Sequence, residues 1–438
     1  MKTIILFFPI YVLLGSVQAQ KQDTSTSKTL EDCLVYALNH QTNIRQSMID
    51  EQITEREIKV RLSDWYPQIN FSGNYQRNFQ RPTSIFNNGA QPVGTYYASG
   101  GYFGLNQTLF NRDVVLAAQS AGDVRLSAKQ STVNTRIEVV SNVSKAFYDL
   151  LLSQEQIALL DTDIVLLQRS LKDAYNQYKG GIVDKTDYQR ATISLNNARA
   201  ARKTAGETLK SRTAVLKLLM SYPVDKYLEV TYDSLRMKEE IASFDTLQSL
   251  DINNRIEYQQ LLTQKKLEED NLKYFKWGFL PEVSVYGQYN LNYYNNQFKD
   301  LYTQNYPNSY AGLSVTLPLF TGTRRVQEVK IAKLRIDRLE YNFISLKDSI
   351  RTQYIQSISA FKADLNNYYE QKQNMELALE VYNIVQLQYR AGVKTYLDVV
   401  VSNNDLFAAQ VNFTNAIYRV LSDKIDVERA LGTLKYNY

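Results

Sequence analysis

The sequence predicts an α+β membrane protein that combines four amphipathic β-strands with very long α-helices. Segments near residues 70, 105, 285 and 315 alternate apolar and polar side chains, as strands with one apolar face do. Between them lie proline-free stretches of more than about 30 residues, in which apolar or small residues recur every three or four positions, as in coiled coils. Because the same order of segments occurs in both halves of the chain, we predict a tandem internal repeat.

The first 19 residues have the form of a secretory signal peptide: a lysine at position 2, an apolar run up to Leu14, and small residues before Ala19. The only cysteine, Cys33, does not directly follow this predicted cleavage point, so we expect no lipid anchor. A single cysteine also cannot form an intrachain disulfide. Beyond residue 19 no apolar stretch reaches about 18 residues, so any membrane span is expected to be a β-barrel.

Two landmarks define the predicted repeats. Trp65-Tyr66-Pro67 is echoed by Phe279-Leu280-Pro281, and the segment from Gln177 to Gly181 is echoed at nearly the same spacing by the segment from Gln388 to Gly392. We therefore expect a first repeat at 20–222 and a second at 251–438, each with a helix, a strand pair, a very long helix, a glycine turn and another long helix. The segment 223–250 is expected to link them and to pack around the middle of the helices.

The strand pairs are expected at about 68–79 with 97–110, and at about 282–294 with 308–320. Strands of about ten residues are long enough to cross a bilayer when tilted. The connections at 81–94 and 295–309 are rich in Asn, Gly, Pro, Gln and Tyr and are expected to be exposed loops. Four strands cannot close a barrel, so the pattern favours an oligomer.

The helices are expected to turn near 179–185 and near 390–394. The stretch from Asp113 to Tyr178 alone predicts a helix of about 100 Å at about 1.5 Å per residue. Many of its seam positions are Ala, Ser or Thr, which bury little apolar area, so lateral association into a larger helical wall is expected. A simple coiled coil or a solenoid would explain the helices but not the strand pairs.

In this order, these motifs resemble the TolC-type outer membrane factor family over essentially the whole mature chain. The resemblance lies in the two Pro-containing strand starts, in the exits Leu109-Phe110 and Leu319-Phe320, in the two glycine turns, and in the segment 429–434. It implies a homotrimer in which twelve strands close one barrel in outer membrane lipid and the helices form a tapering barrel across the periplasm. It also implies an exit duct that serves a tripartite efflux pump or a type I secretion system, with a periplasmic adaptor protein docked on the helical tips beneath an inner membrane pump.

The family resemblance also assigns roles at the turns. Tyr389 and Lys394 match positions that link the inner helix pair to the outer pair, and Thr186 and Asp187 match their partners. A phenol and an ammonium facing a hydroxyl and a carboxylate could hold the periplasmic aperture closed by hydrogen bonds and release it when the helices untwist.

Asp398 matches a position at which the family places a ring of carboxylates across the pore, which would favour cations. The alternative is an ordinary first-turn acid that is stabilised by the helix dipole. Where a second acidic ring would be expected, the chain has Val401, so cation selectivity is expected to be weaker. Gly181 and Gly392 are expected to end helices with positive φ.

No catalytic, cofactor or metal site is predicted. The only histidine, His40, and Cys33 share one amphipathic helical segment that begins with an apparent capping box, Thr29 with Asp32, and neither has a cluster with metal-ligand or nucleophile spacing. The formal charge of +5 is spread along helices, so no nucleic-acid partner is expected. The alternative function is a periplasmic or surface coiled-coil scaffold without transport. Drugs, metal ions and proteins are all compatible as cargo, although five Met and one His disfavour a dedicated soft-metal duct.

Overall fold

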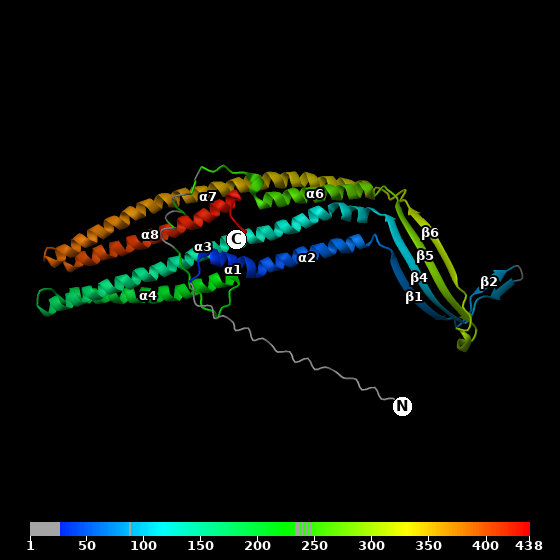
Figure 1. Cartoon of the computed structure of the whole chain (residues 1–438), viewed down its shortest axis with the longest axis horizontal. Coiled ribbons are helices and arrows are strands. Elements are labelled where there is room, and N and C mark those ends of the chain that lie inside the picture. Colours follow the sequence, from blue (N-terminus) through cyan, green and yellow to red (C-terminus); the bar gives the residue numbers. More distant parts are fainter. Residues whose placement is uncertain (1–26, 87–88, 233–236, 238–239, 242–243, 246) are drawn as a thin grey trace, which may run out of the picture.

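The computed structural model describes residues 27–86, 89–232, 237, 240–241, 244–245 and 247–438. The predicted signal peptide at 1–19 lies outside these residues. The described chain is elongated, with a β-sheet at one end and two helical turns at the other (Figure 1).

One antiparallel sheet has the strand order β1-β4-β5-β6. Its strands are β1 (Gln68–Arg77), β4 (Tyr97–Phe110), β5 (Glu282–Asn295) and β6 (Asn308–Thr316). Phe71 lies opposite Phe103 in the β1–β4 register, and their ring centroids are 4.8 Å apart. The last strand ends short of the expected residue 320 because Pro318 has no backbone N–H to donate to a ladder.

The segment 81–94 is not only a loop, as its composition suggested. It contains a hairpin of β2 (Thr83–Phe86) and β3 (Gly89–Pro92), in which Thr83 lies opposite Pro92. The β-branched Thr83 and Ile85 favour extended backbone, and Gly89 adopts a φ of 98° that permits a tight reversal.

Two pairs of helices leave the sheet together. The pairs are α2 (Thr42–Ser63) with α3 (Arg112–Lys179), and α6 (Ile256–Trp277) with α7 (Arg324–Arg390). At 68 and 67 residues, α3 and α7 are each about 100 Å long. No helix in the described part of the chain combines the length and the apolar character that a membrane crossing requires.

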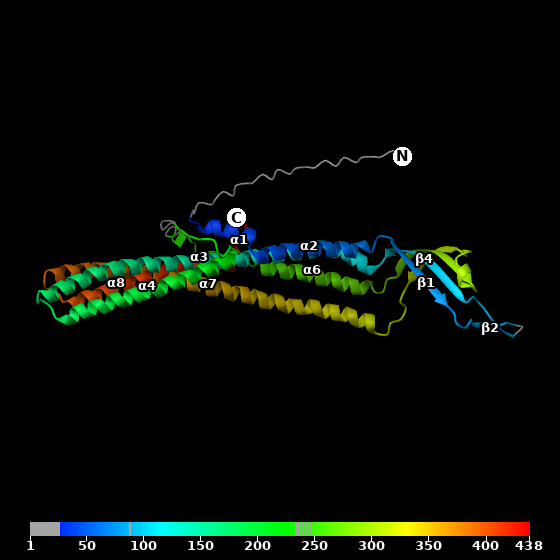
Figure 2. The ribbon, with the colours of Figure 1, turned by 90° about the horizontal axis from the view of Figure 1, so that it is seen from below.

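In the half of the molecule distant from the sheet, α3 packs along α4 (Lys185–Met220) and α7 packs along α8 (Tyr396–Leu431). Contacts between α3 and α8 join these two hairpins, so the four helices run side by side in the order α4, α3, α8, α7 (Figure 1). The view from below shows all four at the end of the molecule opposite the sheet (Figure 2). The sequence of helix, strand pair, long helix, turn and helix thus occurs twice along the chain.

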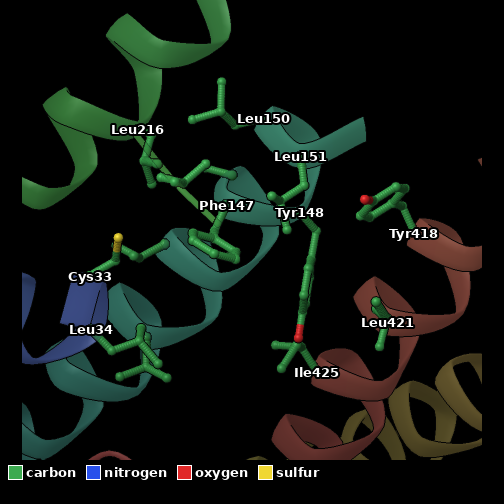
Figure 3. Close-up of a cluster of buried hydrophobic side chains, with 14 of the residues drawn as sticks. Cys33, Leu34, Phe147, Tyr148, Leu150, Leu151, Leu216, Tyr418, Leu421 and Ile425 are labelled. Atoms are coloured by element: carbon green, nitrogen blue, oxygen red, sulfur yellow. The ribbon is translucent and has the colours of Figure 1, made fainter. Parts of the chain in front are cut away.

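The main hydrophobic core lies at the middle of the helices. The first helix, α1 (Leu30–His40), places Cys33 against Phe147 of α3 and Leu216 of α4, and Leu421 of α8 closes the cluster (Figure 3). Burial raises the pKa of the Cys33 thiol to about 12 and keeps it protonated. The start of α1 has the predicted capping box, which is confirmed.

The linking segment contributes to this core. Leu228 and Val230 are buried in it, and the backbone N–H of Lys28 donates to the carbonyl of Glu229 at 2.8 Å. A short 3-10 helix (Ile252–Asn254) then leads into α6. The described part of the linking segment therefore packs against the helices at their midpoint.

The helical turns as candidate functional site

The first turn joins α3 to α4. Gly181 has a φ of 68°, which an L side chain adopts only with strain, and the N–H of Ile182 donates to the carbonyl of Gln177 at 2.9 Å. Asp184 caps α4 by accepting a hydrogen bond from the N–H of Thr186 at 3.1 Å. These bonds satisfy a backbone group at each helix end that would otherwise be free, and they help to fix the shape of the tip.

The second turn joins α7 to α8 by the same geometry. Gly392 has a φ of 76°, and the N–H of Val393 donates to the carbonyl of Gln388 at 2.9 Å. Thr395 caps α8 in a capping box: the N–H and hydroxyl of Thr395 donate to one carboxylate oxygen of Asp398 at 2.9 and 2.8 Å. The two tips are thus closely similar in backbone structure.

One hydrogen bond joins the two tips directly. The hydroxyl of Tyr389 on α7 donates to the side-chain oxygen of Gln177 on α3 at 2.8 Å. Both side chains are partly buried, and burial is the largest cause that raises the pKa of Tyr389. Tyr389 therefore stays a neutral hydrogen-bond donor at physiological pH.

A second contact lies beside the first. Tyr396 is only 1% exposed and packs against Ala174 of α3 and Ala191 of α4. Its ring centroid is 6.1 Å from that of Tyr389, and the hydroxyl of Ser170 donates to its phenolic oxygen at 3.3 Å. The second tip therefore inserts an aromatic side chain into a notch that two alanines leave in the first hairpin.

A buried polar pair lies further from the tips, between α3 and α8. Asn403 donates to a carboxylate oxygen of Asp163 at 2.9 Å, and both residues are buried. Burial raises the pKa of Asp163, and the hydrogen bond from Asn403 opposes this shift. A lateral or axial slip of one hairpin against the other would leave a buried carboxylate without its donor, so this pair fixes their relative register.

Comparison with known proteins identifies the family. The model of the outer membrane efflux protein family matches residues 34–220 and 265–433. This chain belongs to the outer membrane efflux protein family. It is therefore a transport protein of the outer membrane and not an enzyme.

Individual relatives agree with this assignment. The chain is 20% identical over 448 residues to the outer membrane protein TolC of Escherichia coli, covering 97% of this chain and 86% of TolC. It is also 20% identical over 412 residues to the toluene efflux pump outer membrane protein TtgC of Pseudomonas putida, covering 92% and 82%. The crystal structure of the CmeC outer membrane channel of Campylobacter jejuni has the same helix-dominated fold, with a TM-score of 0.74, 16% identity, and 100% and 95% of the two chains covered.

The residues predicted to form the closure network all lie at or beside the two helical turns. Lys394 lies 3.8 Å from the carboxylate of Asp398, within its own turn. Thr186 and Asp187 lie in the first turn of α4. Within the described part of a single chain, no hydrogen bond or ion pair joins Tyr389 or Lys394 to either of them.

The carboxylate of Asp398 interacts with two neighbouring residues, Thr395 and Lys394. Hydrogen bonds from the Thr395 backbone and hydroxyl are the main causes that lower its pKa, and the charge of Lys394 lowers it further. The carboxylate is thus ionised at physiological pH, and it remains partly exposed. No group of three or more His, Cys, Asp or Glu among the described residues is arranged to hold a metal ion.

Sequence patterns did not reveal Gln177, Tyr396 or the Asp163–Asn403 pair. Their roles depend on how two hairpins more than about 200 residues apart in sequence pack together, which no local periodicity specifies. One signal was available: Thr395 and Asp398 have the spacing of a capping box, which places Tyr396 at the first helical position.

Proposed function

We propose that this outer membrane efflux protein works as a homotrimeric exit duct. The observation that supports the trimer is the sheet: one chain supplies four strands, and its two edge strands, β1 and β6, are each paired on one side only within the described chain. An uncovered edge leaves a row of backbone donors and acceptors that cannot remain unpaired in lipid. Each chain therefore needs neighbours at both edges.

The strand directions allow simple closure. Successive strands in the order β1-β4-β5-β6 are antiparallel, so β6 runs opposite to β1 and can pair with β1 of the next copy in the same antiparallel way. Three copies give twelve strands and one closed barrel in the outer membrane. The helices extend the wall on one side of the sheet, into the periplasm.

We infer that the chain arose by tandem duplication. Support comes from the repeated order of elements and from the matching tips, in which Gly181 and Gly392 occupy equivalent turns. A trimer of such chains has six similar helical hairpins around one axis, which suits a tapering helical barrel.

The tips are proposed to gate this duct. Tyr389 with Gln177, and Tyr396 in its alanine notch, would hold the second hairpin against the first. Lys394, Thr186 and Asp187 would complete the closure network between hairpins, and Asp398 of each copy would contribute to a ring of carboxylates at the mouth. Opening would break the polar contacts as the hairpins separate.

The partners follow from the position of the tips. We propose that a periplasmic adaptor protein docks there and connects the duct to an inner membrane pump, as the name of the toluene efflux pump relative suggests. Either a tripartite efflux pump or a type I secretion system fits this arrangement. Outer membrane lipid would surround the strands, and the pump and adaptor would select the cargo.

Single-channel recording in planar bilayers tests this function. The purified protein should produce small, discrete, cation-preferring conductance and have the mass of a trimer by light scattering after correction for detergent. A scaffold without transport would give no conductance.

A further inference from the structure

The two faces of the four-stranded sheet differ in chemistry. Side chains alternate between the faces, so Phe71, Phe103 and Leu313 lie on one face with most of the other apolar strand residues. The opposite face carries mainly amide, hydroxyl, glycine and tyrosine residues. Among the described strand residues its one charged side chain is Glu282, at the end of β5 nearest the helices (Figure 1). In the proposed duct this face lines the lumen, and it is here named the lumen face.

Three tyrosines occur at even intervals on the lumen face. Tyr286 and Tyr294 lie eight residues apart on β5, and Tyr102 of β4 lies opposite Asn290, midway between them. The three levels are therefore about 13 Å apart at about 3.3 Å per residue, or about 26 Å in all. This span matches the apolar band of about 25 Å of an outer membrane barrel. Tyr286, Tyr102 and Tyr294 are here named the tyrosine track.

Glycines allow two of these rings to lie against the sheet. A Cβ atom at Gly312, which is opposite Tyr286 in the β5–β6 register, would stand 2.7 Å from the Cζ atom of Tyr286. A Cβ atom at Gly100 would likewise stand 2.5 Å from the Cζ atom of Tyr102. Each ring therefore covers a glycine and occupies the space that a side chain would take. The other side of the ring is left toward the lumen, and Tyr286 remains 40% exposed.

Neutral hydrogen-bonding groups flank the track. The ring of Tyr310 meets that of Tyr286 at an angle of 71°, and its hydroxyl donates to the side-chain oxygen of Gln288. On the next level the amide of Asn290 donates to the side-chain oxygen of Asn308 at 2.7 Å. Amide groups both donate and accept, so they suit a solute that carries many hydroxyl groups. A charged solute would find no opposite charge along the track.

We propose that the tyrosine track binds neutral oligosaccharide chains as they pass through the duct, a substrate class that rests on the exit duct proposed above. The C–H groups on the face of a sugar ring pack on the electron-rich face of a tyrosine, and the hydroxyl groups at its rim exchange hydrogen bonds with the flanking amides. Because the three levels are alike and each contact is weak, a chain can move from one level to the next without being trapped.

Saturation-transfer difference NMR on the trimer tests this proposal. The protein is purified in lauryldimethylamine oxide, a detergent without a sugar headgroup, and the probes are maltohexaose and cellohexaose, two neutral linear sugars with different linkages. The protein should transfer saturation to the ring protons of at least one of them. Tyr102→Leu and Tyr286→Leu should each weaken binding by about threefold, and together by about tenfold.

Three further variants separate the ring faces from general effects on the sheet. Gly312→Ala should also weaken binding, because its methyl group would displace the Tyr286 ring. Tyr286→Phe keeps the ring and should bind as tightly as the wild type. Tyr289→Leu removes an exposed tyrosine from the opposite face of the same strand and should have no effect. Native gels and circular dichroism check that each variant is a folded trimer.

The proposal is overturned if neither sugar receives saturation, or if the variant with both leucines binds as tightly as the wild type. An equal loss of binding in Tyr289→Leu would also contradict it. Binding of benzyltrimethylammonium in preference to either sugar would show that the track recognises organic cations instead. A trimer that conducts ions but binds neither sugar would refute only this substrate class, whereas a protein without conductance would refute the duct itself.

Discussion

The hydroxyl of Tyr389 donates a hydrogen bond to the side-chain oxygen of Gln177, 2.8 Å away, and so connects α7 to α3 close to both helical turns. These residues are far apart in sequence, and their bond joins the two tips beside the longer hydrogen bond from Ser170 to Tyr396. Because it lies close to both turns, it is the contact that any separation of the hairpins would break most readily.

Removing this bond should open the mouth. Tyr389→Phe combined with Lys394→Ser should raise single-channel conductance, because Phe keeps the packing while the polar links are lost. Tyr382→Phe is the matched control, since the Tyr382 hydroxyl interacts only with Gln386 of its own helix in the described structure. Wild-type conductance in the double variant would show that this contact does not restrain the aperture.

The carboxylate of Asp398 should determine ion preference. Asp398→Asn removes the charge while retaining a side chain that can accept the capping hydrogen bonds, so cation preference should fall in reversal-potential measurements. Thr395→Ala, which weakens the cap but keeps the charge, should leave the preference nearly unchanged. Because the lowered pKa keeps Asp398 ionised, the contribution of Asp398 to cation preference should not vary between about pH 5 and 8. Unchanged selectivity in Asp398→Asn would argue against a carboxylate ring.

The turn glycines should be sensitive to a side chain. Gly392→Ala places an L residue at a φ of 76° and should destabilise the tip by about 1 kcal/mol, measured as a lower thermal midpoint by circular dichroism. Gly206→Ala lies within α4, where the added methyl group would meet only the Arg202 guanidinium at an ordinary contact distance of 3.9 Å, and it should stabilise that helix by about 1 kcal/mol. Equal effects of the two substitutions would show that positive φ is not the constraint at the turn.

A half-buried acidic pair should make the helices pH-sensitive. Burial, followed by the neighbouring Asp364 and Asp426, raises the pKa of Asp423 to about 7, while Lys145 of α3 lowers it. The folded state therefore binds a proton that the unfolded state has released above about pH 4, so stability should fall as pH rises from about 4 to about 7 and level off above that. The thermal midpoint should drop between about pH 5 and 7. Asp423→Asn should flatten this dependence.

Asp405→Asn is the control for that experiment, because Asp405 is exposed on the same helix. Its pH dependence should match the wild type. A wild-type slope in Asp423→Asn would mean that another group titrates in this range.

The strands and long helices could be predicted because their patterns are local. Ile69, Phe71 and Tyr75 alternate with polar residues, and this period of two is sufficient to recognise β1. The contacts at the tips could not be predicted in the same way. Whether Tyr389 meets Gln177 or Asp187 depends on how the two hairpins are rotated about their axes. The heptad pattern of each hairpin does not determine this rotation.

The β2–β3 hairpin shows a different reason for a missed element. Composition marked 81–94 as a loop because Asn, Gly and Pro dominate it, yet the same residues are those that allow a tight hairpin when β-branched residues such as Thr83 and Ile85 flank them. Composition alone does not distinguish a loop from a short pair of hydrogen-bonded strands.

The central claim is that three copies of this chain enclose one duct that the helical tips close. Single-channel conductance of the purified protein, recorded together with its detergent-corrected mass, tests it most directly. A trimer with small, discrete, cation-preferring conductance that increases in the Tyr389→Phe, Lys394→Ser variant is the predicted result. A soluble, non-conducting monomer or dimer would contradict it.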